Sequence, residues 1–493
     1  MKKEVALAVV TTTAATVVVV VTLVRQYWKQ KKDRQWKKCQ QIIRKFAREC
    51  ATPVPKLWEV ANAMVSDMEA SLSSDEARSC LNMLVSYVSP LPTGNEQGMY
   101  YGVNLRGTDF LMVCARLGGK NEPISDFYKE EISLPSNVML GTSQELYDII
   151  AVELSKFISA HPENNDETAA NDKKLGFTLS YAANQAAATS GAAIKWKNFS
   201  ADDIVKGGKE LVSEINQALE KHGVNMRVHA LVDDTVGDLA GARYYNKESV
   251  AAICLGMGTN AAYVDTAQSG PRWRGSLLPN SGEIVISIEW GNFNSCQLPI
   301  TRFDASLDAE SSNPGSRIFE KLISGMYLGE IVRRVLAKMA KETALFGETV
   351  PPKLLIPYLL RPPDMAAMHQ DTSEDREVVH EKLKEIFGIT NSTEMAREIV
   401  AEVCDIVTER GARLAGAGIV AIAKKLGRIA NRRSVITIEG GLYEHYRIFR
   451  NYLHSSVWEM LGDELSGNII IEHAHGGSGA GALFLAASQN PDS

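Results

Sequence analysis

The chain lacks the cysteine spacing that marks metal ribbons, redox dithiols and disulfide scaffolds. Its 493 residues include seven cysteines, and no two of them form a C-x-x-C pair. Scattered cysteines of this kind are typical of a protein in a reducing compartment. With 45% hydrophobic and 23% charged residues, the chain is also unlike a disordered protein. Its length suits two or three domains, or one large two-lobed unit.

Basic charge is scarce over most of the chain. Residues 1–48 hold twelve Lys or Arg and two acids, a net charge of +10, whereas residues 49–493 hold 41 basic and 57 acidic residues, a net charge of −16. A nucleic-acid-binding domain carries basic charge over its folded surface. The sequence therefore predicts no nucleic-acid partner.

The first long segment has no charge at all. The twenty residues from Val5 to Val24 are Ala, Val, Leu and Thr, followed at once by a basic cluster that begins at Arg25. Twenty apolar residues in a helix span roughly 30 Å of hydrocarbon. We expect residues 5–24 to form a membrane anchor, with the tail 1–4 across the membrane and the body in the cytosol. A cleaved signal peptide is the alternative, although no A-x-A site precedes Arg25. Residues 25–50 are expected to form a solvated basic helix near anionic lipid.

The body alternates short apolar runs with longer helical patterns, which predicts an α/β protein. Residues 100–104 and 110–116 read as strands around a turn at 105–109, and residues 251–256 and 261–265 repeat this plan around 257–260. The repeat suggests two lobes built on related halves. One-faced apolar spacing predicts core helices at 318–338 and 395–410. Residues 347–375, with five prolines, are expected to be a connector.

Glycine-rich turns follow several predicted strands. They lie at 256–260, at 439–441 and at 476–481, and the last opens an Ala/Leu-rich helix. Backbone amides in such turns can hold phosphate oxygens, although most turns of this kind have no ligand. None is a Walker loop, since no G-K-[ST] follows. His473 and His475 lack further ligands nearby, so no resident metal site is expected.

Acidic residues end several apolar runs, namely Asp233, Asp234, Glu289 and Glu320. A carboxylate at a strand end can take a proton from an alcohol or hold a sugar hydroxyl. A single acid at such a position is more often a solvated loop residue without a function. The four acids indicate a site only when they are considered together.

Four segments together resemble the eukaryotic hexokinase family, most of all its membrane-anchored plant type. They are LVDDTVGDLAGARY (231–244), LGMGTNAAYV (255–264), IEWGNF (288–293) and NPGSRIFEKLISGMYLGEIVRRVL (313–336). The resemblance covers about residues 40–487. It implies an α/β, two-lobed, actin-like ATPase (ribonuclease H-like) fold, with a small lobe at 90–229, a large lobe at 230–487 and a cleft that closes on sugar. The C-terminal helix is expected to return to the small lobe, and the anchor to lie in the mitochondrial outer membrane.

The resemblance also implies a reaction, the ATP-dependent phosphorylation of a hexose 6-hydroxyl with Mg²⁺ held by ATP. Asp234 would be the general base. The sugar would be held by Ser180, Lys197, Asn198, Asp233, Asn260, Glu289 and Glu320. The nucleotide would be held by Arg106, Gly107, Thr108, Asp109, Gly258, Thr259, Gly440, Gly441 and Ser478.

Several positions depart from the family pattern. The first phosphate turn of the family reads Asp-Leu-Gly-Gly-Thr-Asn-Phe-Arg, and here it reads NLRGTDFL (104–111). Asn104 removes a charge expected to help hold Mg²⁺, Arg106 replaces a glycine, and Asp109 brings negative charge beside phosphates. Asp233 replaces an asparagine, which exchanges an amide donor for a carboxylate. Three losses of about 1.4 kcal/mol each would slow catalysis about a thousandfold.

Two hypotheses follow. The chain is either a hexose 6-phosphotransferase of reduced efficiency, or a non-catalytic sugar sensor or scaffold at the mitochondrial surface. The retained acids favour the first, and the altered first turn favours the second.

Overall fold

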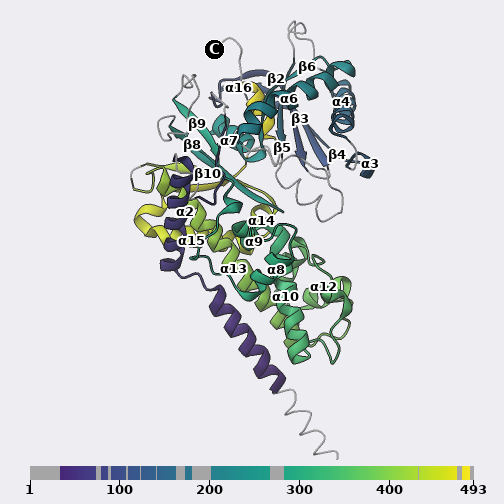
Figure 1. Ribbon diagram of the computed structural model, residues 1–493, viewed down its shortest axis with the longest axis vertical. Coiled ribbons are helices and arrows are strands. Elements are labelled where there is room, and N and C mark those ends of the chain that lie inside the picture. The colour runs from purple at the N-terminus through teal and green to yellow at the C-terminus, as the bar shows by residue number, and fades with distance from the viewer. Residues whose placement is uncertain are drawn as a thin grey trace, which may run out of the picture. The chain divides into compact units, whose positions relative to one another are not determined.

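The computed structural model describes residues 34–73, 79–86, 90–106, 109–120, 122, 124–139, 142–162, 173–179, 201–266, 282–430, 432–474 and 480–488 (Figure 1). The predicted anchor, residues 5–24, lies outside these ranges. Among the helices within them, none is both long and apolar enough to cross a membrane. The chain divides into two compact units, one of residues 1–51, 299–303 and 329–407 and the other of residues 52–298, 304–328 and 408–493.

The larger unit contains two mixed β-sheets. The six-stranded sheet has the order β1 (Leu84–Ser86), β9 (Glu283–Ser287), β8 (Thr259–Thr266), β7 (Ser249–Leu255), β10 (Ser434–Glu439) and β11 (Ile469–His473). The five-stranded sheet has the order β4 (Ser125–Ser133), β3 (Asp109–Gly118), β2 (Gln97–Arg106), β5 (Lys173–Leu179) and β6 (Met226–Asp233). Strands β7, β10 and β11 are parallel, as are β2, β5 and β6. The predicted α/β class is confirmed.

The two repeated strand-turn-strand segments are both antiparallel hairpins, β2–β3 and β7–β8. Their strands are longer than the sequence predicts. Backbone pairing continues to Arg106 and Asp109 in the first hairpin and to Leu255 and Thr259 in the second. The expected turn residues Leu105, Arg106 and Asp109 therefore belong to strands, because the ladder extends beyond the apolar run.

The five-stranded sheet is covered on both faces. On one face, Tyr101, Val103 and Leu105 join a buried cluster with residues of α4 (Ser143–Ala160) and α6 (Ala201–Lys221). On the other, Leu111 and Val113 join α7 (Asp234–Tyr245) and α16 (Gly481–Ser488). This second cluster also includes residues of β7, β8 and β9, so α7 and α16 lie between the two sheets. The alternation along β2 and β3 is the period of two expected of strands.

The backbone of α16 approaches its neighbours closely. A Cβ on Gly176 of β5 would lie 1.7 Å from the carbonyl oxygen of Ala482. A Cβ on Gly481 would lie 2.1 Å from the carbonyl carbon of Gly237, in α7. Glycine is required at both positions because any side chain would push the helix away. The helix after the last glycine-rich segment is thus fixed against both the five-stranded sheet and α7.

Other helices differ from the sequence expectations. The single helix expected at 318–338 is two, α9 (Ile318–Ile323) and α10 (Gly325–Thr343). Ser324 between them is extended, with φ −90° and ψ 153°. The amides of Gly325 and Met326 donate to the carbonyl oxygens of Gly256 and Met257. The helix is therefore interrupted at Ser324, and these two hydrogen bonds hold the β7–β8 turn. The connector expected at 347–375 contains two short helices, η3 (Pro352–Leu355) and α11 (Pro362–His369).

The remaining helices and short turns are α2 (Val54–Leu72), α3 (Ser136–Met139), η2 (Trp290–Asn292), α8 (Arg302–Glu310), α12 (Glu377–Phe387), α13 (Glu394–Lys425), α14 (Gly441–Glu444) and α15 (Arg447–Ser466). The core helix expected at 395–410 lies inside α13, which is longer because its buried pattern continues past Arg410.

The smaller unit is helical in its described residues, and residues 34–50 form one of its helices. The expected helix is present over residues 34–50, but it is not solvated on all sides. Cys39, Ile43, Phe46 and Cys50 are buried along one face. Phe46 meets the ring of Phe303 edge to face at 5.4 Å between ring centroids. Six basic residues lie among the apolar ones in this segment, so the apolar stripe forms only when the chain is wound into a helix.

Candidate functional site

Strand β6 ends at two adjacent aspartates, where α7 begins. Asp233 is the N-cap of α7 and accepts a hydrogen bond from the amide of Val236 at 3.0 Å. Asp234 Oδ1 accepts from the amide of Thr235 at 3.0 Å. Burial raises the pKa of Asp233, against the opposing effect of hydrogen bonds from Ser287, Val236 and Thr235. Asp233 is therefore occupied in capping the helix, while Asp234 lies at the positive end of the helix dipole.

The β7–β8 turn contains the second predicted phosphate loop. The amide of Gly256 donates to the carbonyl oxygen of Gly258 at 3.1 Å. The hydroxyl of Thr259 donates to the carbonyl oxygen of Cys254 at 2.8 Å and accepts from Trp290 Nε1 at 2.8 Å. The Thr259 hydroxyl thus maintains the shape of the turn.

Asn260 and Glu289 form a buried hydrogen-bonded pair. Asn260 Nδ2 donates to Glu289 Oε1 and to Ser287 Oγ, each at 3.0 Å. Asn260 Oδ1 accepts from the amide of Ala261 at 2.7 Å and from the amide of Glu289 at 3.0 Å. Glu289 has φ 55° and ψ 40°, a left-handed conformation that is uncommon for a residue with a side chain. These bonds hold the strained residue in place.

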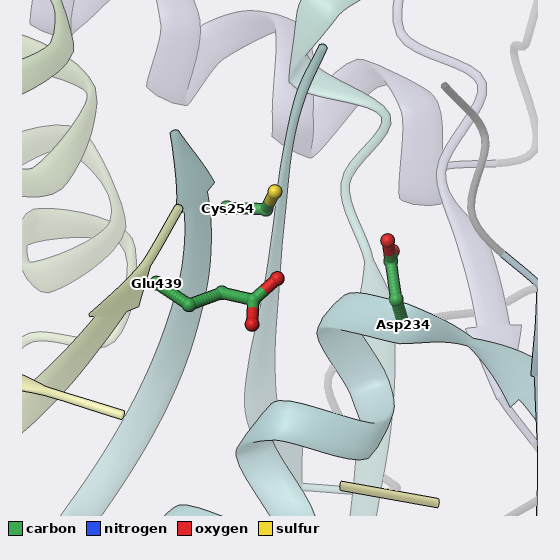
Figure 2. Close-up of side chains that lie close together, drawn as sticks. All are labelled: Asp234, Cys254 and Glu439. Atoms are coloured by element: carbon green, nitrogen blue, oxygen red, sulfur yellow. The ribbon is translucent and has the colours of Figure 1, made fainter. Parts of the chain in front are cut away.

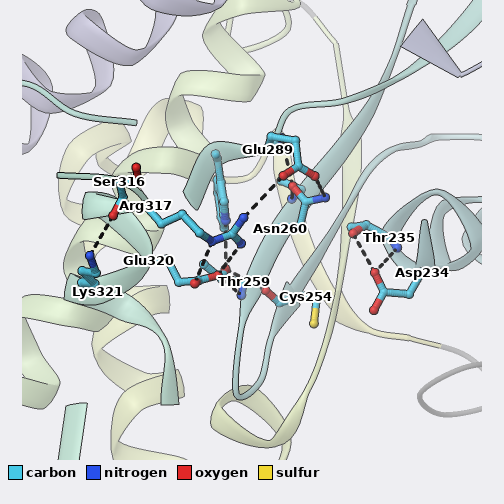
Figure 3. A network of polar contacts seen from close by, with 12 residues as sticks. Asp234, Thr235, Cys254, Thr259, Asn260, Glu289, Ser316, Arg317, Glu320 and Lys321 are labelled. Carbon is cyan, nitrogen blue, oxygen red and sulfur yellow. Dashed lines mark hydrogen bonds and ion pairs between the residues drawn. The ribbon is translucent and has the colours of Figure 1, made fainter. Parts of the chain in front are cut away.

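Glu320 is bound by Arg317, which is not among the predicted site residues. Figure 3 shows Arg317 between Glu289 and Glu320. Arg317 Nε lies 2.9 Å from Glu320 Oε1, and its NH2 lies 2.7 Å from Glu320 Oε2. Its NH1 lies 3.7 Å from Glu289 Oε2. The amide of Thr259 donates to Glu320 Oε2 at 3.2 Å, so this carboxylate joins the β7–β8 turn to α9.

Lys321 holds the turn that presents Arg317. Its Nζ lies 2.6 Å from Asp308 Oδ1 and donates to the carbonyl oxygens of Asn313 and Ser316 at 2.8 and 2.9 Å. Arg317 itself has φ 53°. The turn and its lysine therefore fix the direction of the guanidinium group.

The gathered acids alter the electrostatics of the site. The pKa of Glu289 is raised to about 8, mainly by burial, with Arg317 acting in the opposite direction and Asp233, Glu320 and Asp234 adding to the increase. A site of this composition presents carboxyl oxygens that accept from hydroxyls and an amide that donates to them. Such an arrangement suits a polyol ligand.

The altered first turn carries its own ion pairs. Arg106 NH2 lies 2.7 Å from Asp109 Oδ1, and 2.7 Å from Glu131 Oε2 on β4. Asn104 is 2% exposed on β2, and no group in the described part of the chain donates to its Oδ1. Arg106 thus turns towards acids on β3 and β4.

Gly440 joins β10 to α14, and Gly441 is the first residue of α14. A Cβ on Gly440, which has φ 102°, would lie 2.5 Å from the carbonyl oxygen of Leu255. The amide of Gly440 donates to Glu444 Oε1 at 3.2 Å. The structure therefore brings this turn to the end of β7, beside the β7–β8 turn.

Six predicted site residues lie outside the described ranges, so their places in the site stay predictions. They are Gly107, Thr108, Ser180, Lys197, Asn198 and Ser478.

Sequence reasoning missed Arg317 and a second group of side chains near Asp234. Ligand atoms of Asp234, Cys254 and Glu439 all lie within 4.8 Å of one another (Figure 2). The signal for Arg317 was its position between two candidate acids and after a Pro-Gly turn. Cys254 and Glu439 gave no local signal, because they come together only through strand pairing.

Comparison with known proteins agrees with this geometry. Two sequence profiles, both described as hexokinase, match residues 42–244 and 250–488. The chain is 48% identical to Hexokinase-1 of Spinacia oleracea over 99% of this chain and 98% of that one. It is 49% identical to Hexokinase-1 of Arabidopsis thaliana over 92% of each chain.

Solved structures give the same result. The hexokinase of Schistosoma mansoni complexed with glucose aligns with a TM-score of 0.76 at 26% identity, over 93% of this chain and 99% of that one. A second hexokinase crystal structure, at 23% identity, aligns with a TM-score of 0.73 over 92% and 100% of the two chains and supports the fold. The chain belongs to the hexokinase family and has its α/β fold.

Proposed function

We propose that the chain phosphorylates the 6-hydroxyl of a hexose, glucose or fructose, with ATP, at low efficiency. The observation that carries the proposal is the buried network of Asn260, Glu289 and Glu320 beside Asp234. Family membership supports hexose and Mg²⁺-ATP as substrates. We further propose that the two sheets are the two halves of an actin-like ATPase fold.

In the proposed reaction, Asp234 takes the proton of the 6-hydroxyl as that oxygen attacks the terminal phosphorus of ATP. Asn260, Glu289 and Glu320 hold ring hydroxyls and so fix the attacking oxygen. The segments 105–109, 256–259 and 440–441 would hold the phosphates and the nucleoside. Phosphoryl transfer depends mainly on positioning and charge neutralisation, so small changes in these turns alter the rate directly.

Three features support low efficiency. Arg106 occupies a position where the family has a backbone-exposing glycine, and its partner Asp109 adds an acid beside the phosphates. Asn104 supplies no negative charge towards Mg²⁺. Arg317 already binds both carboxylate oxygens of Glu320 and lies near Glu289. A sugar hydroxyl therefore has to compete with Arg317 for these carboxylates.

A coupled assay for hexose 6-phosphate on a fragment from about residue 40 onward tests the proposal, with Asp234→Ala as the control. Turnover no greater than that of the control would reject catalysis. The combined change Asn104→Asp, Arg106→Gly, Asp109→Asn and Asp233→Asn is expected to raise activity strongly. Asn is as good an N-cap as Asp, so the last change keeps α7 capped.

The second candidate function is a non-catalytic sugar sensor or scaffold. The ion pairs of Arg317 with both sugar-site glutamates favour it, because they satisfy these acids without ligand. Glucose titration by calorimetry distinguishes a sugar sensor from a scaffold. Heat of binding without turnover supports a sensor, and the absence of both heat and thermal shift leaves a scaffold.

We also propose that residues 5–24 anchor the chain in the mitochondrial outer membrane with the body in the cytosol. The uncharged run and the basic cluster after it support this proposal. Full-length and residue 40–493 chains, each fused to a fluorescent protein, provide the test. Only the full-length chain should stay with mitochondria after alkaline extraction, and a protease added outside should remove its fluorescent C-terminus.

A further inference from the structure

Four side chains converge where β7 and β10 end and α7 begins. Cys254 and Glu439 are register partners on adjacent parallel strands. Asp234 and Asp238 lie four residues apart on α7, and such residues share one face of a helix. Figure 2 shows Glu439 reaching from its strand towards the strand that carries Cys254, with Asp234 on the helix opposite.

Among the described residues, the carboxyl group of Asp238 lacks a hydrogen-bond donor for one of its oxygens. Asp238 is 5% exposed, and no group in the described part of the chain donates a hydrogen bond to its Oδ2. Its carboxyl group lies within hydrogen-bonding reach of Glu439 and also feels the charge of Asp234. Buried carboxylates that face one another require protons or a cation between them.

The donor set selects the class of cation. It combines the sulfur of Cys254 with carboxylate oxygens of Asp234 and Glu439. Mg²⁺ prefers six oxygen ligands in an octahedron, whereas Zn²⁺ accepts sulfur and oxygen together in a tetrahedron. Three protein ligands and one water are a common zinc arrangement, in which ligand atoms lie roughly 3 to 4 Å apart. The three ligand atoms here already lie within 4.8 Å of one another, so only a small contraction is needed.

We propose that Asp234, Cys254 and Glu439 bind Zn²⁺ or a similar divalent transition-metal ion, and that Asp238 holds the Glu439 carboxyl group in position. Binding replaces the thiol proton of Cys254, which passes to solvent, by a bond from sulfur to the metal. The ion offsets the charge of the carboxylates. The metal site does not depend on the proposed phosphotransferase activity. Both functions use Asp234, however, so an Asp234 that is bound to the metal cannot also act as the base in phosphoryl transfer.

Cobalt binding to the full-length chain tests the site without any activity measurement. The metal-stripped chain is titrated with Co²⁺, followed by the near-ultraviolet thiolate-to-cobalt absorption band, and then with Zn²⁺ to displace it. We expect one ion per chain. Cys254→Ser should lose the band, and Glu439→Gln should weaken binding at least about tenfold. Asp238→Asn should keep the band with affinity about 10–100-fold lower, as for residues that orient a ligand.

Cys80→Ser is the matched control. Cys80 Sγ lies 2.7 Å from Asp67 Oδ2, so it also pairs a thiol with a carboxylate, but in the described residues no third ligand joins them. This variant should bind Co²⁺ like the parent. A parent chain without the band, a band that survives Cys254→Ser, or Mg²⁺ competing at equal concentration would overturn the proposal. Thermal melting without metal identifies variants that fail to fold, and if Cys254→Ser is one of them, Glu439→Gln decides.

Discussion

Arg106 NH2 lies 2.7 Å from Asp109 Oδ1, where β2 and β3 pair for the last time. Both residues depart from the pattern that the family resemblance implies for the predicted first phosphate turn, and here their charges offset each other. Glu131 on β4 adds a second acid at 2.7 Å from the same nitrogen. The negative charge of Asp109 is therefore offset by Arg106, and the two substitutions act as a pair.

Single changes in this pair should move nucleotide affinity in opposite directions. Asp109→Asn removes one of the two acids that hold Arg106, together with its own negative charge, and should raise affinity for a fluorescent ATP analogue. Arg106→Ala leaves Asp109 and Glu131 uncompensated and should lower it. Each shift is expected to be about threefold to tenfold, since the pair is partly exposed. A gain in both variants would show instead that the arginine side chain excludes the nucleotide sterically.

Removal of Arg317 should destabilise the unliganded protein. Arg317→Gln leaves the buried Glu320 without its charge partner, which costs about 3–5 kcal/mol. Urea unfolding measures the loss. The double variant Arg317→Gln with Glu320→Gln should recover part of it, because no buried charge is left unpaired. Additive losses in the double variant would contradict a direct coupling of the two residues.

The pH dependence of stability should report on Glu289. Its folded pKa of about 8 lies above the ordinary 4.5, so between these values the folded chain holds a proton that the unfolded chain has released. The free energy of unfolding should therefore fall as pH rises through this window, by up to about 1.4 kcal/mol per pH unit, and level off above pH 8.

Glu289→Gln removes the titrating group and should flatten this slope. Urea denaturation of both chains at pH 6, 7, 8 and 9 gives the comparison. Parallel curves for the parent and the variant would mean that Glu289 keeps its ordinary pKa.

The close approach of α16 to β5 should make Gly176 intolerant of any side chain. Gly176→Ala places a Cβ 1.7 Å from a backbone oxygen and should destabilise the protein by more than about 3 kcal/mol. Gly467→Ala is the control, since nothing lies within 4 Å of its Cβ. The control should stay within about 0.5 kcal/mol of the parent by thermal melting or urea unfolding. Equal effects in both variants would contradict the packing described for α16.

Parts of the fold could be predicted from local pattern. Alternating apolar runs around glycine turns gave both hairpins, and the long one-faced spacing gave the core of α13. The break at Ser324 could not be predicted, because the amides that leave the helix there bond to the distant carbonyls of Gly256 and Met257. The burial of one face of residues 34–50 could not be predicted for a similar reason, since its packing partner Phe303 is distant in the sequence.

The sequence by itself determined the α/β class, the family resemblance and the set of acids that line the candidate site. These properties depend on residue type and on short spacings, which a linear pattern preserves. Only the tertiary structure decided that Arg106 pairs with Asp109, that Arg317 bridges Glu289 and Glu320, and that Cys254 and Glu439 face Asp234. Such contacts join separate strands and helices, and their energies depend on distance and burial, which are set only when the sheets and α7 pack together.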